Sequence, residues 1–414
     1  MSNRRKIFQK VNKKVLIATI DIGKKSNIGY WRCYNGIDCK TFEFSNTREG
    51  FDYFWRKIFT AKVNNKADRI IVGYESTGPY GKPLTHYLKN RPVKQVLVNP
   101  MHTKRLKELD DNSPLKTDRK DPRVLADIIE LGHWLSVVVP VGAAAELREL
   151  AHSRDRLMVL RTAEYNRLQN LLSVFFPEFL TVMRNVRTKS ALCLLSRYPS
   201  TDDIIAAGCD SLAEILHNIS RGQLGVERSR MLFEAAEHSV GVREGKESMA
   251  DEVRFIIERI FLYNRQIFEK EEMIKRYLSE IPVSSNLLSI KGIGPITVGV
   301  IIGEIGNFDT FSSPRAVIKF AGLNLYEVSS GKHIGIRRIS KRGRHLLRKI
   351  LFFAAINVVR KDGILHDYYH KLIDNGMLRM KALIAVMRKL LKIIFSLARN
   401  KTFYMPEYSL KKVA

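Results

Sequence analysis

The sequence has 414 residues, of which 45% are hydrophobic, and its 70 Lys and Arg residues outnumber its 42 Asp and Glu residues. A chain of this length exceeds one ordinary hydrophobic core, so we expect a folded protein of two or three domains. The formal net charge of +28 is spread along the whole chain, which favours contact with a long polyanion. Nucleic acid is the first partner to consider, and an anionic membrane surface is the competing one.

Membrane insertion and secretion are not predicted. The sequence has no uncharged apolar run of about 18 residues, and no apolar signal core follows the basic start at 1–14. The four cysteines lack CxxC spacing and nearby paired histidines, so we expect reduced thiols rather than zinc ligands or disulfides. They are Cys33, Cys39, Cys193 and Cys209. These features together predict a cytoplasmic protein with no membrane partner.

Strand and helix patterns alternate in the N-terminal part of the chain. The expected strands span residues 15–20, 28–34, 40–44, 69–75 and 93–98, and the expected helices span 48–60 and 82–90. An Asn35-Gly36 turn makes the second and third strands antiparallel neighbours. This order predicts a layered α/β domain, in which functional residues gather at the carboxyl ends of strands.

Long amphipathic helices are predicted in the middle of the chain, at 144–172 and 249–278, with coiled-coil character. They could pair with one another or with another subunit, so we expect a homo-oligomer, either a dimer or a tetramer. A small helical insert separates them. After Pro282, glycines punctuate short helices, and 380–398 is predicted to be a basic amphipathic helix. The predicted domains are 1–140, 141–282 and 283–414.

Four acidic residues are candidate metal ligands. Asp21 and Glu75 each end a predicted strand, and the spacing of Asp118 and Asp121 would put them on one face of a helix. Phosphodiester chemistry commonly uses two divalent ions held by converging carboxylates, and Mg²⁺ prefers such oxygen ligands. Taken singly, Asp21 or Glu75 is equally well explained as a turn residue, and Thr117 or Asp118 as a helix cap.

Three segments containing these acids resemble the DEDD signature of an insertion-sequence transposase family. They are Ile20-Asp-Ile-Gly-Lys24, Tyr74-Glu-Ser-Thr-Gly78 and Lys116-Thr-Asp-Arg-Lys-Asp121. The N-terminal domain of that family is similar to Holliday-junction resolvases of the RuvC type. The resemblance implies an RNase H-like fold and two Mg²⁺ ions, with Mn²⁺ as an alternative, held by Asp21, Glu75, Asp118 and Asp121. Pro122 departs from the family, where Ala is usual, but Pro is acceptable in the first turn of a helix.

A second constellation lies near the C-terminus. Lys291-Gly-Ile-Gly294 resembles a helix-hairpin-helix turn, whose glycines let backbone amides approach a phosphate, although an ordinary connection between helices is equally compatible. Ser329-Ser330-Gly331 precedes a basic segment. Ser-Gly is typical of a polar loop, yet a serine there could act as a nucleophile beside cations that stabilise a pentacoordinate phosphate. The candidate nucleic-acid-binding residues are Lys291, Gly292, Gly294, Arg337, Arg338, Lys341, Arg342 and Arg348.

Residues 287–359 are similar to the C-terminal domain of the same transposase family, whose Ser-Gly motif carries a nucleophilic serine. Ser330, directly before Gly331, matches that motif, and Ser329 is the alternative. The resemblance implies excision and insertion of an insertion sequence, with donor and target DNA cut and rejoined through a covalent phosphoserine intermediate. It also implies guidance by a noncoding bridge RNA that pairs with both DNAs. The expected fold class is α/β plus α: an RNase H-like (RuvC-like) N-terminal domain, long coiled-coil helices and a mainly helical C-terminal domain.

Other functions remain open on the residues alone. A structure-specific RuvC-like endonuclease would use the same acids with water as the nucleophile, and an architectural nucleic-acid binder would need none of them. An actin-like or sugar-kinase ATPase also begins with a strand followed by Asp-x-Gly. The positive charge and the absence of a P-loop pattern around 24–26 disfavour that third reading.

Overall fold

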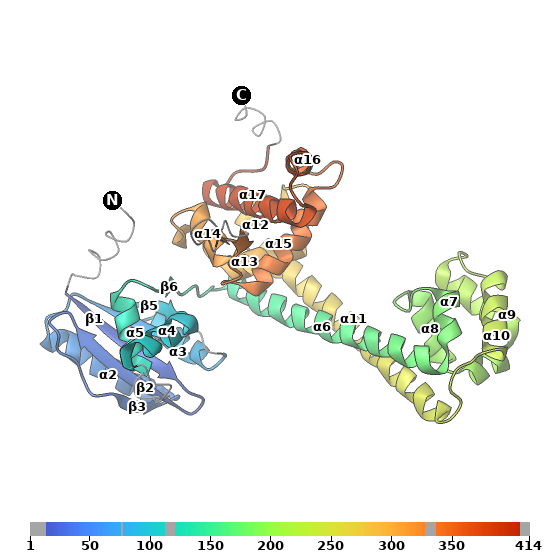
Figure 1. Cartoon of the computed structure of the whole chain (residues 1–414), viewed down its shortest axis with the longest axis horizontal. Helices are drawn as coiled ribbons and strands as arrows, with labels where there is room; N and C mark the ends of the chain where they lie inside the picture. Colours follow the sequence, from blue (N-terminus) through green and yellow to red (C-terminus); the bar gives the residue numbers. More distant parts are fainter. Residues whose placement is uncertain (1–13, 76–77, 112–120, 328–336, 406–414) are drawn as a thin grey trace. The chain divides into compact units, whose positions relative to one another are not determined.

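The computed structural model describes residues 14–75, 78–111, 121–327 and 337–405. The chain divides into two compact units, Met1–Val139 (unit 1) and Pro140–Ala414 (unit 2). Unit 1 combines a sheet with helices, whereas the described residues of unit 2 form helices and one short two-stranded ribbon (Figure 1). Among the helices of the described residues, none has the length and apolarity needed to cross a membrane.

The core of unit 1 is a six-stranded sheet with the strand order β3-β2-β1-β4-β5-β6. Its strands are β1 (Val15–Ile22), β2 (Ser26–Cys33), β3 (Phe42–Ser45), β4 (Arg69–Glu75), β5 (Val93–Val98) and β6 (Leu135–Ser136). The first three form an antiparallel meander, and β4 and β5 run parallel to β1. The five predicted strands are confirmed, and every end lies within two residues of its predicted position because buried apolar runs define the strands.

Helices cover both faces of this sheet. Helices α2 (Arg48–Asn64) and α3 (Gly81–Lys89) pack on one face, where Phe54 and Leu84 meet β-strand residues such as Ile20. Helix α5 (Asp121–Glu130) packs on the other face, where Ile129 meets Ile17. Helix α4 (Pro100–Asp111) precedes α5 and contacts it. Side chains alternate between the faces of a strand, so each strand contributes to both cores.

Two long helices organise unit 2. Helices α6 (Ala143–Phe175) and α11 (Lys246–Ser279) run side by side (Figure 1) and are joined by an Arg154–Glu271 ion pair at 2.6 Å. The sequence left open whether they pair with each other or with another subunit, and within this chain they pair with each other. Between them come α7 (Pro177–Met183), α8 (Lys189–Arg197), α9 (Thr201–Ser220) and α10 (Val226–Glu237). These four helices share a hydrophobic core with the end of α6 and the beginning of α11.

The C-terminal helices pack against the other end of this pair. Gly303 of α13 allows the close approach, since a Cβ there would lie 2.7 Å from the backbone nitrogen of Arg148 in α6. Gly299 similarly faces Ile274 of α11. The elements of this part are α12 (Val283–Leu288), α13 (Pro295–Ile305), α14 (Pro314–Phe320), β7 (Leu325–Tyr326), β8 (Arg338–Ile339), α15 (His345–Val358), α16 (His366–Asp374) and α17 (Arg379–Asn400).

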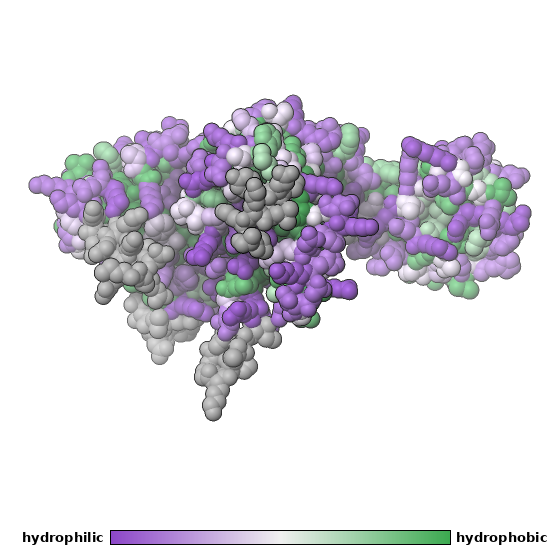
Figure 2. Space-filling model, turned by 90° about the horizontal axis from the view of Figure 1, so that it is seen from above, coloured by the Kyte–Doolittle hydropathy of each residue, from purple (hydrophilic) through white to green (hydrophobic). Residues whose placement is uncertain are grey.

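The surface reflects the composition. Hydrophilic side chains cover much of the face seen in Figure 2, and apolar ones form smaller patches among them. With a net charge of +28, this surface repels other cations and attracts polyanions.

Candidate functional site

The carboxyl ends of β1 and β4 bring two of the candidate metal ligands together. The strands are parallel neighbours, and the last pair in their register joins Ile20 to Tyr74. Continuing that register by one residue puts Asp21 of β1 beside Glu75, the last residue of β4. Both residues are half-buried. Two acids that are distant in the sequence therefore share one edge of the sheet.

Asp21 and Glu75 lie on the face of the sheet that α5 covers. Side chains two or four residues apart in a strand point to the same face. Ile17 and Ile71, each four residues earlier, belong to the core that packs against α5. Both acids therefore project toward the side from which α5 approaches.

Helix α5 brings a third candidate ligand to this edge. Asp121 is its first residue, and Pro122 occupies its first turn, as the sequence predicts for this departure from the family pattern. The hydroxyl of Thr19 donates a hydrogen bond of 2.5 Å to the Pro122 carbonyl. Gly73 in β4 leaves room for the helix, since a Cβ there would lie 2.1 Å from Cδ1 of Ile129. The start of α5 is thus tethered to β1 two residues before Asp21.

Thr19→Val tests this tether. Thr19 is fully buried, and valine has the same shape without the donor, so the Pro122 carbonyl loses its partner at a cost of about 1–3 kcal/mol. All three tryptophans, Trp31, Trp55 and Trp134, lie in unit 1, so their fluorescence during urea unfolding reports this unit alone. Thr19→Ser, which keeps the hydroxyl, is the control and should lose less stability than Thr19→Val. Equal losses in both variants would show that packing, not the hydrogen bond, matters here.

The donor chemistry of this edge suits a hard divalent cation, because carboxylates lie at the ends of two adjacent strands and Asp121 begins the helix tethered to one of them. Asp118, the fourth candidate, lies outside the described residues. Within the described ranges the structure gathers no group of three or more His, Cys, Asp or Glu side chains that could hold a metal ion. The described part therefore supplies two adjacent carboxylates and a tethered helix start rather than a closed ligand set.

The predicted helix-hairpin-helix turn joins α12 to α13. Ile290 and Ile293 are buried and anchor it, whereas Lys291 and Gly292 between them and Gly294 after them are exposed. Gly292 has a φ of +94°, a conformation that residues with a Cβ rarely adopt. The turn therefore presents two glycines and a lysine at the surface, and binding of a phosphate there stays a prediction.

A short ribbon holds the segment that contains Ser329 and Ser330, which themselves lie outside the described residues. Strands β7 and β8 pair Leu325 with Ile339, so the two ends of this segment meet. Glu327 and Arg337 close the ribbon with a contact of 2.7 Å. The described residues that flank the nucleophile candidates in the sequence are therefore paired with each other.

The basic candidate residues around this ribbon differ in how freely they can contact a phosphate. Arg337 is paired with Glu327, and Arg348 donates a hydrogen bond of 3.0 Å to the Ala321 carbonyl. Burial lowers the pKa of the Arg348 guanidinium. By contrast, Arg338 in β8 and Lys341 and Arg342 just after it are exposed. These three are the best placed of the set to meet a phosphate.

The sequence reasoning missed a buried acid beneath this region. Glu304 in α13 is only 1% exposed, and its carboxylate lies 2.6 Å from Nε2 of His152 and 3.8 Å from Nε of Arg344. Burial opposes its charge, but the hydrogen bond from His152 and the charges of Arg344 and Arg148 outweigh burial and hold the pKa of Glu304 below its usual value. Burial also lowers the pKa of Arg344 to about 10. The sequence feature that could have identified Glu304 is a single acidic residue within the otherwise apolar segment that forms helix α13.

Comparisons with known proteins place both ends of the chain in related families. Residues 18–177 match a family model described as "Transposase", of the DEDD type found in IS110 elements. Residues 284–370 match the model of the "Transposase IS116/IS110/IS902 family". The first match spans all four acids, and the second spans the hairpin turn, both serines and the basic candidates.

Several curated relatives agree with these matches. A 43.6 kDa protein of insertion element IS110 from Streptomyces coelicolor is 26% identical over 292 residues, which cover 70% of this chain and 72% of the relative. A 44.8 kDa protein of insertion element IS116 from Streptomyces clavuligerus is 22% identical over 292 residues, covering 70% and 73%. A transposase for insertion sequence element IS1328 from Yersinia enterocolitica is 34% identical over 86 residues, covering 21% and 26%.

Proposed function

Because this chain belongs to the DEDD-type IS110 family of transposases, we propose that it excises and inserts an insertion sequence by cutting and rejoining donor and target DNA. The observation that carries the proposal is the double match: one family model covers the acids of unit 1 and the other covers the Ser-Gly segment of unit 2. A nuclease that used only the acids would not need the second region.

We further propose that unit 1 is RNase H-like. Its antiparallel meander β3-β2-β1, continued by the parallel strands β4 and β5, supports this assignment. So do the acids at adjacent strand ends, since open α/β sheets bind ligands at the carboxyl edge. Unit 2 is proposed to divide near residue 283 into a helical coiled-coil part and a transposase domain.

Asp21, Glu75, Asp118 and Asp121 are the proposed ligands of two Mg²⁺ ions. Bound there, the ions would stabilise charge on the attacking and leaving oxygens of a phosphodiester displacement. The protein's own contribution is positional. Parallel pairing of β1 with β4 aligns Asp21 with Glu75, and the Thr19–Pro122 hydrogen bond keeps the start of α5, with Asp121, at the same edge.

Ser330 is the proposed nucleophile. Its Oγ would form a bond to phosphorus while one P–O bond to a sugar oxygen breaks. The serine proton passes to a base, and the freed sugar oxygen becomes a hydroxyl by taking up a proton. Rejoining reverses these steps when a sugar hydroxyl from another strand attacks the phosphoserine. Arg338, Lys341 and Arg342 would stabilise the negative charge that develops on the phosphate oxygens.

We also propose that a noncoding bridge RNA selects the DNA sites and that the protein acts as a dimer or tetramer. A net charge of +28 supports binding of both RNA and DNA, because neutralised phosphates release counterions. Base pairing by the RNA would remove the need for a sequence-reading element in the protein.

The central test of the proposed function is a covalent trap. Protein incubated in Mg²⁺ with DNA carrying the element's ends should give a protein–DNA adduct that survives a denaturing gel. If wild-type protein cuts strands without forming any adduct, the protein is instead a RuvC-like endonuclease that uses water as the nucleophile.

A further inference from the structure

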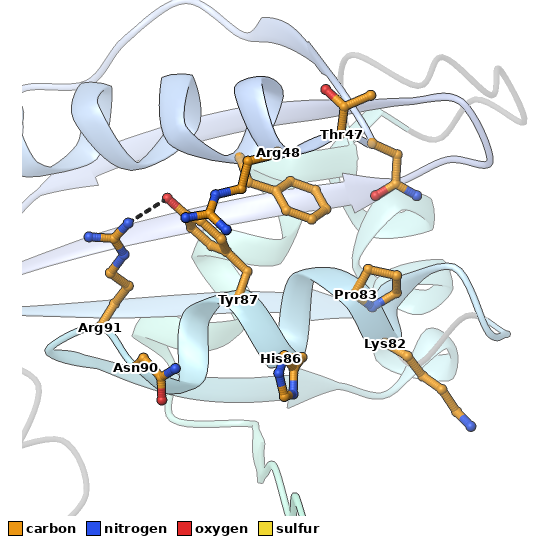
Figure 3. Close-up of a pocket in the computed structure, with 10 residues that line it drawn as sticks. Thr47, Arg48, Lys82, Pro83, His86, Tyr87, Asn90 and Arg91 are labelled. Carbon is orange, nitrogen blue, oxygen red and sulfur yellow. Dashed lines mark hydrogen bonds between the residues drawn. The ribbon is translucent and has the colours of Figure 1, made fainter.

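A groove in unit 1 lies between the start of α2 and the length of α3 (Figure 3). Its volume is about 860 Å³. Both helices pack on the face of the sheet opposite α5, whereas Asp21 and Glu75 project toward the α5 face. The groove is therefore separate from the acidic site.

The lining of the groove is basic. Arg48 comes from α2, Lys82 and His86 from α3, and Arg91 from just beyond α3, and no carboxylate lines the groove. Among the described residues, Asp52 in the second turn of α2 lies 3.6 Å from Nε of the lining residue Arg48. Arg48 exposes 78% of its side chain, so water screens this pair and the guanidinium can exchange it for a phosphate at little cost.

Arg91 is held in place before any ligand arrives. Its guanidinium donates a hydrogen bond of 3.0 Å to the Tyr87 hydroxyl, drawn as a dashed line in Figure 3, and lies 3.5 Å from Asp52. It also stacks over the Trp55 ring at 5.2 Å. The Tyr87 hydroxyl, followed by the nearby guanidinium groups, holds the pKa of Asp52 below its usual value, so this anchor stays charged at neutral pH. A cation fixed in this way loses little side-chain freedom on binding.

The character of the groove indicates the ligand class. Positive charge without a lining carboxylate excludes a metal cation, which needs oxygen or other electron-donating ligands. Arg48, Lys82, His86 and Asn90 are exposed along it, so the groove is open and suits a chain that passes through more than an enclosed small molecule. Cations spaced along a groove are how proteins follow a nucleic-acid backbone without reading bases.

We propose that this groove binds the sugar-phosphate backbone of a single nucleic-acid strand. The inference rests on the proposed role in nucleic-acid chemistry and adds a strand-holding surface on the side of unit 1 away from the acids. DNA and RNA share the phosphodiester that the groove would recognise, so the source of the strand is decided by measuring both.

The test is fluorescence anisotropy of labelled single-stranded DNA and RNA with full-length protein in EDTA. Arg48→Ala/Lys82→Ala should weaken binding of at least one strand about tenfold at low salt, as expected for two lost exposed ion pairs. Each lost contact also lowers the slope of log K against log salt by about 0.7, so the double variant should lower it by about 1.4. Both replaced side chains are exposed, so unit 1 should retain its tryptophan-monitored unfolding midpoint.

Lys40→Ala/Arg56→Ala is the matched control, because it removes the same charge from exposed positions of unit 1 outside the groove. The control should leave the salt slope unchanged. Equal effects of the two pairs would overturn the proposal in favour of general electrostatic attraction. Displacement of the strand by AMP at equal nucleotide concentration would also overturn it, since the site would then be for nucleotides. EDTA removes divalent ions, so this binding measurement does not depend on the proposed Mg²⁺-assisted chemistry, and failure of that chemistry would leave the result intact.

Discussion

Ser330→Ala is expected to form no covalent adduct with DNA and to lose strand exchange by at least about 10³-fold. The change removes the hydroxyl oxygen that is proposed to bond to phosphorus, and alanine offers no replacement. DNA affinity should stay close to that of wild type, because the exposed cations Arg338, Lys341 and Arg342 remain. Denaturing gels of labelled DNA report the adduct, and anisotropy on the same samples reports binding.

Ser329→Ala is the matched control for this prediction. It makes the same chemical change one residue earlier and should keep both adduct and strand exchange. The reverse pattern, with the adduct lost only in Ser329→Ala, would move the nucleophile by one residue. Unchanged cleavage in both variants, without adduct, would show that water attacks the phosphate and that the serine step is wrong.

Local sequence was sufficient to predict most elements of unit 1. The strand expected at 69–75 is β4 and the strand expected at 93–98 is β5, because short buried apolar runs end at polar or turn residues. The long helices expected at 144–172 and 249–278 extend a few residues farther as α6 and α11. Helix ends depend on caps and contacts that periodicity does not encode, such as Thr47, whose side chain caps α2.

Spatial neighbours were harder to predict than elements. No local sequence pattern predicts that β1 pairs in parallel with β4, although this pairing places Asp21 beside Glu75. The family resemblance identified the two acids, and the register explains why they lie side by side. Contacts between distant segments, including Thr19 with Pro122 and Glu304 with His152, have no periodic signature in the sequence. The basic groove could not be predicted either, because Arg48 and Arg91 come to line the same groove only after α2 and α3 pack on the sheet.

Asp21→Asn is expected to lower Mg²⁺-dependent strand cleavage by about 10³-fold, since the metal supplies several kcal/mol of transition-state stabilisation. Asparagine keeps the shape of the side chain but removes a charged ligand from the edge shared with Glu75. Without Mg²⁺, tryptophan fluorescence during urea unfolding of both proteins measures how far the substitution itself changes the stability of unit 1.

The same tryptophan-monitored unfolding experiment measures metal binding independently of catalytic activity. A ligand that binds only the folded state raises stability, so Mg²⁺ should raise the unfolding midpoint of the wild-type protein and not that of Asp21→Asn. Asp68→Asn is the matched control, because Asp68 is an exposed acid at the opposite end of β4, directly before Arg69. It should respond to Mg²⁺ like wild type. If Asp21→Asn keeps both the Mg²⁺ response and cleavage, Asp21 is a turn residue at a strand end and the ligand assignment at this edge fails.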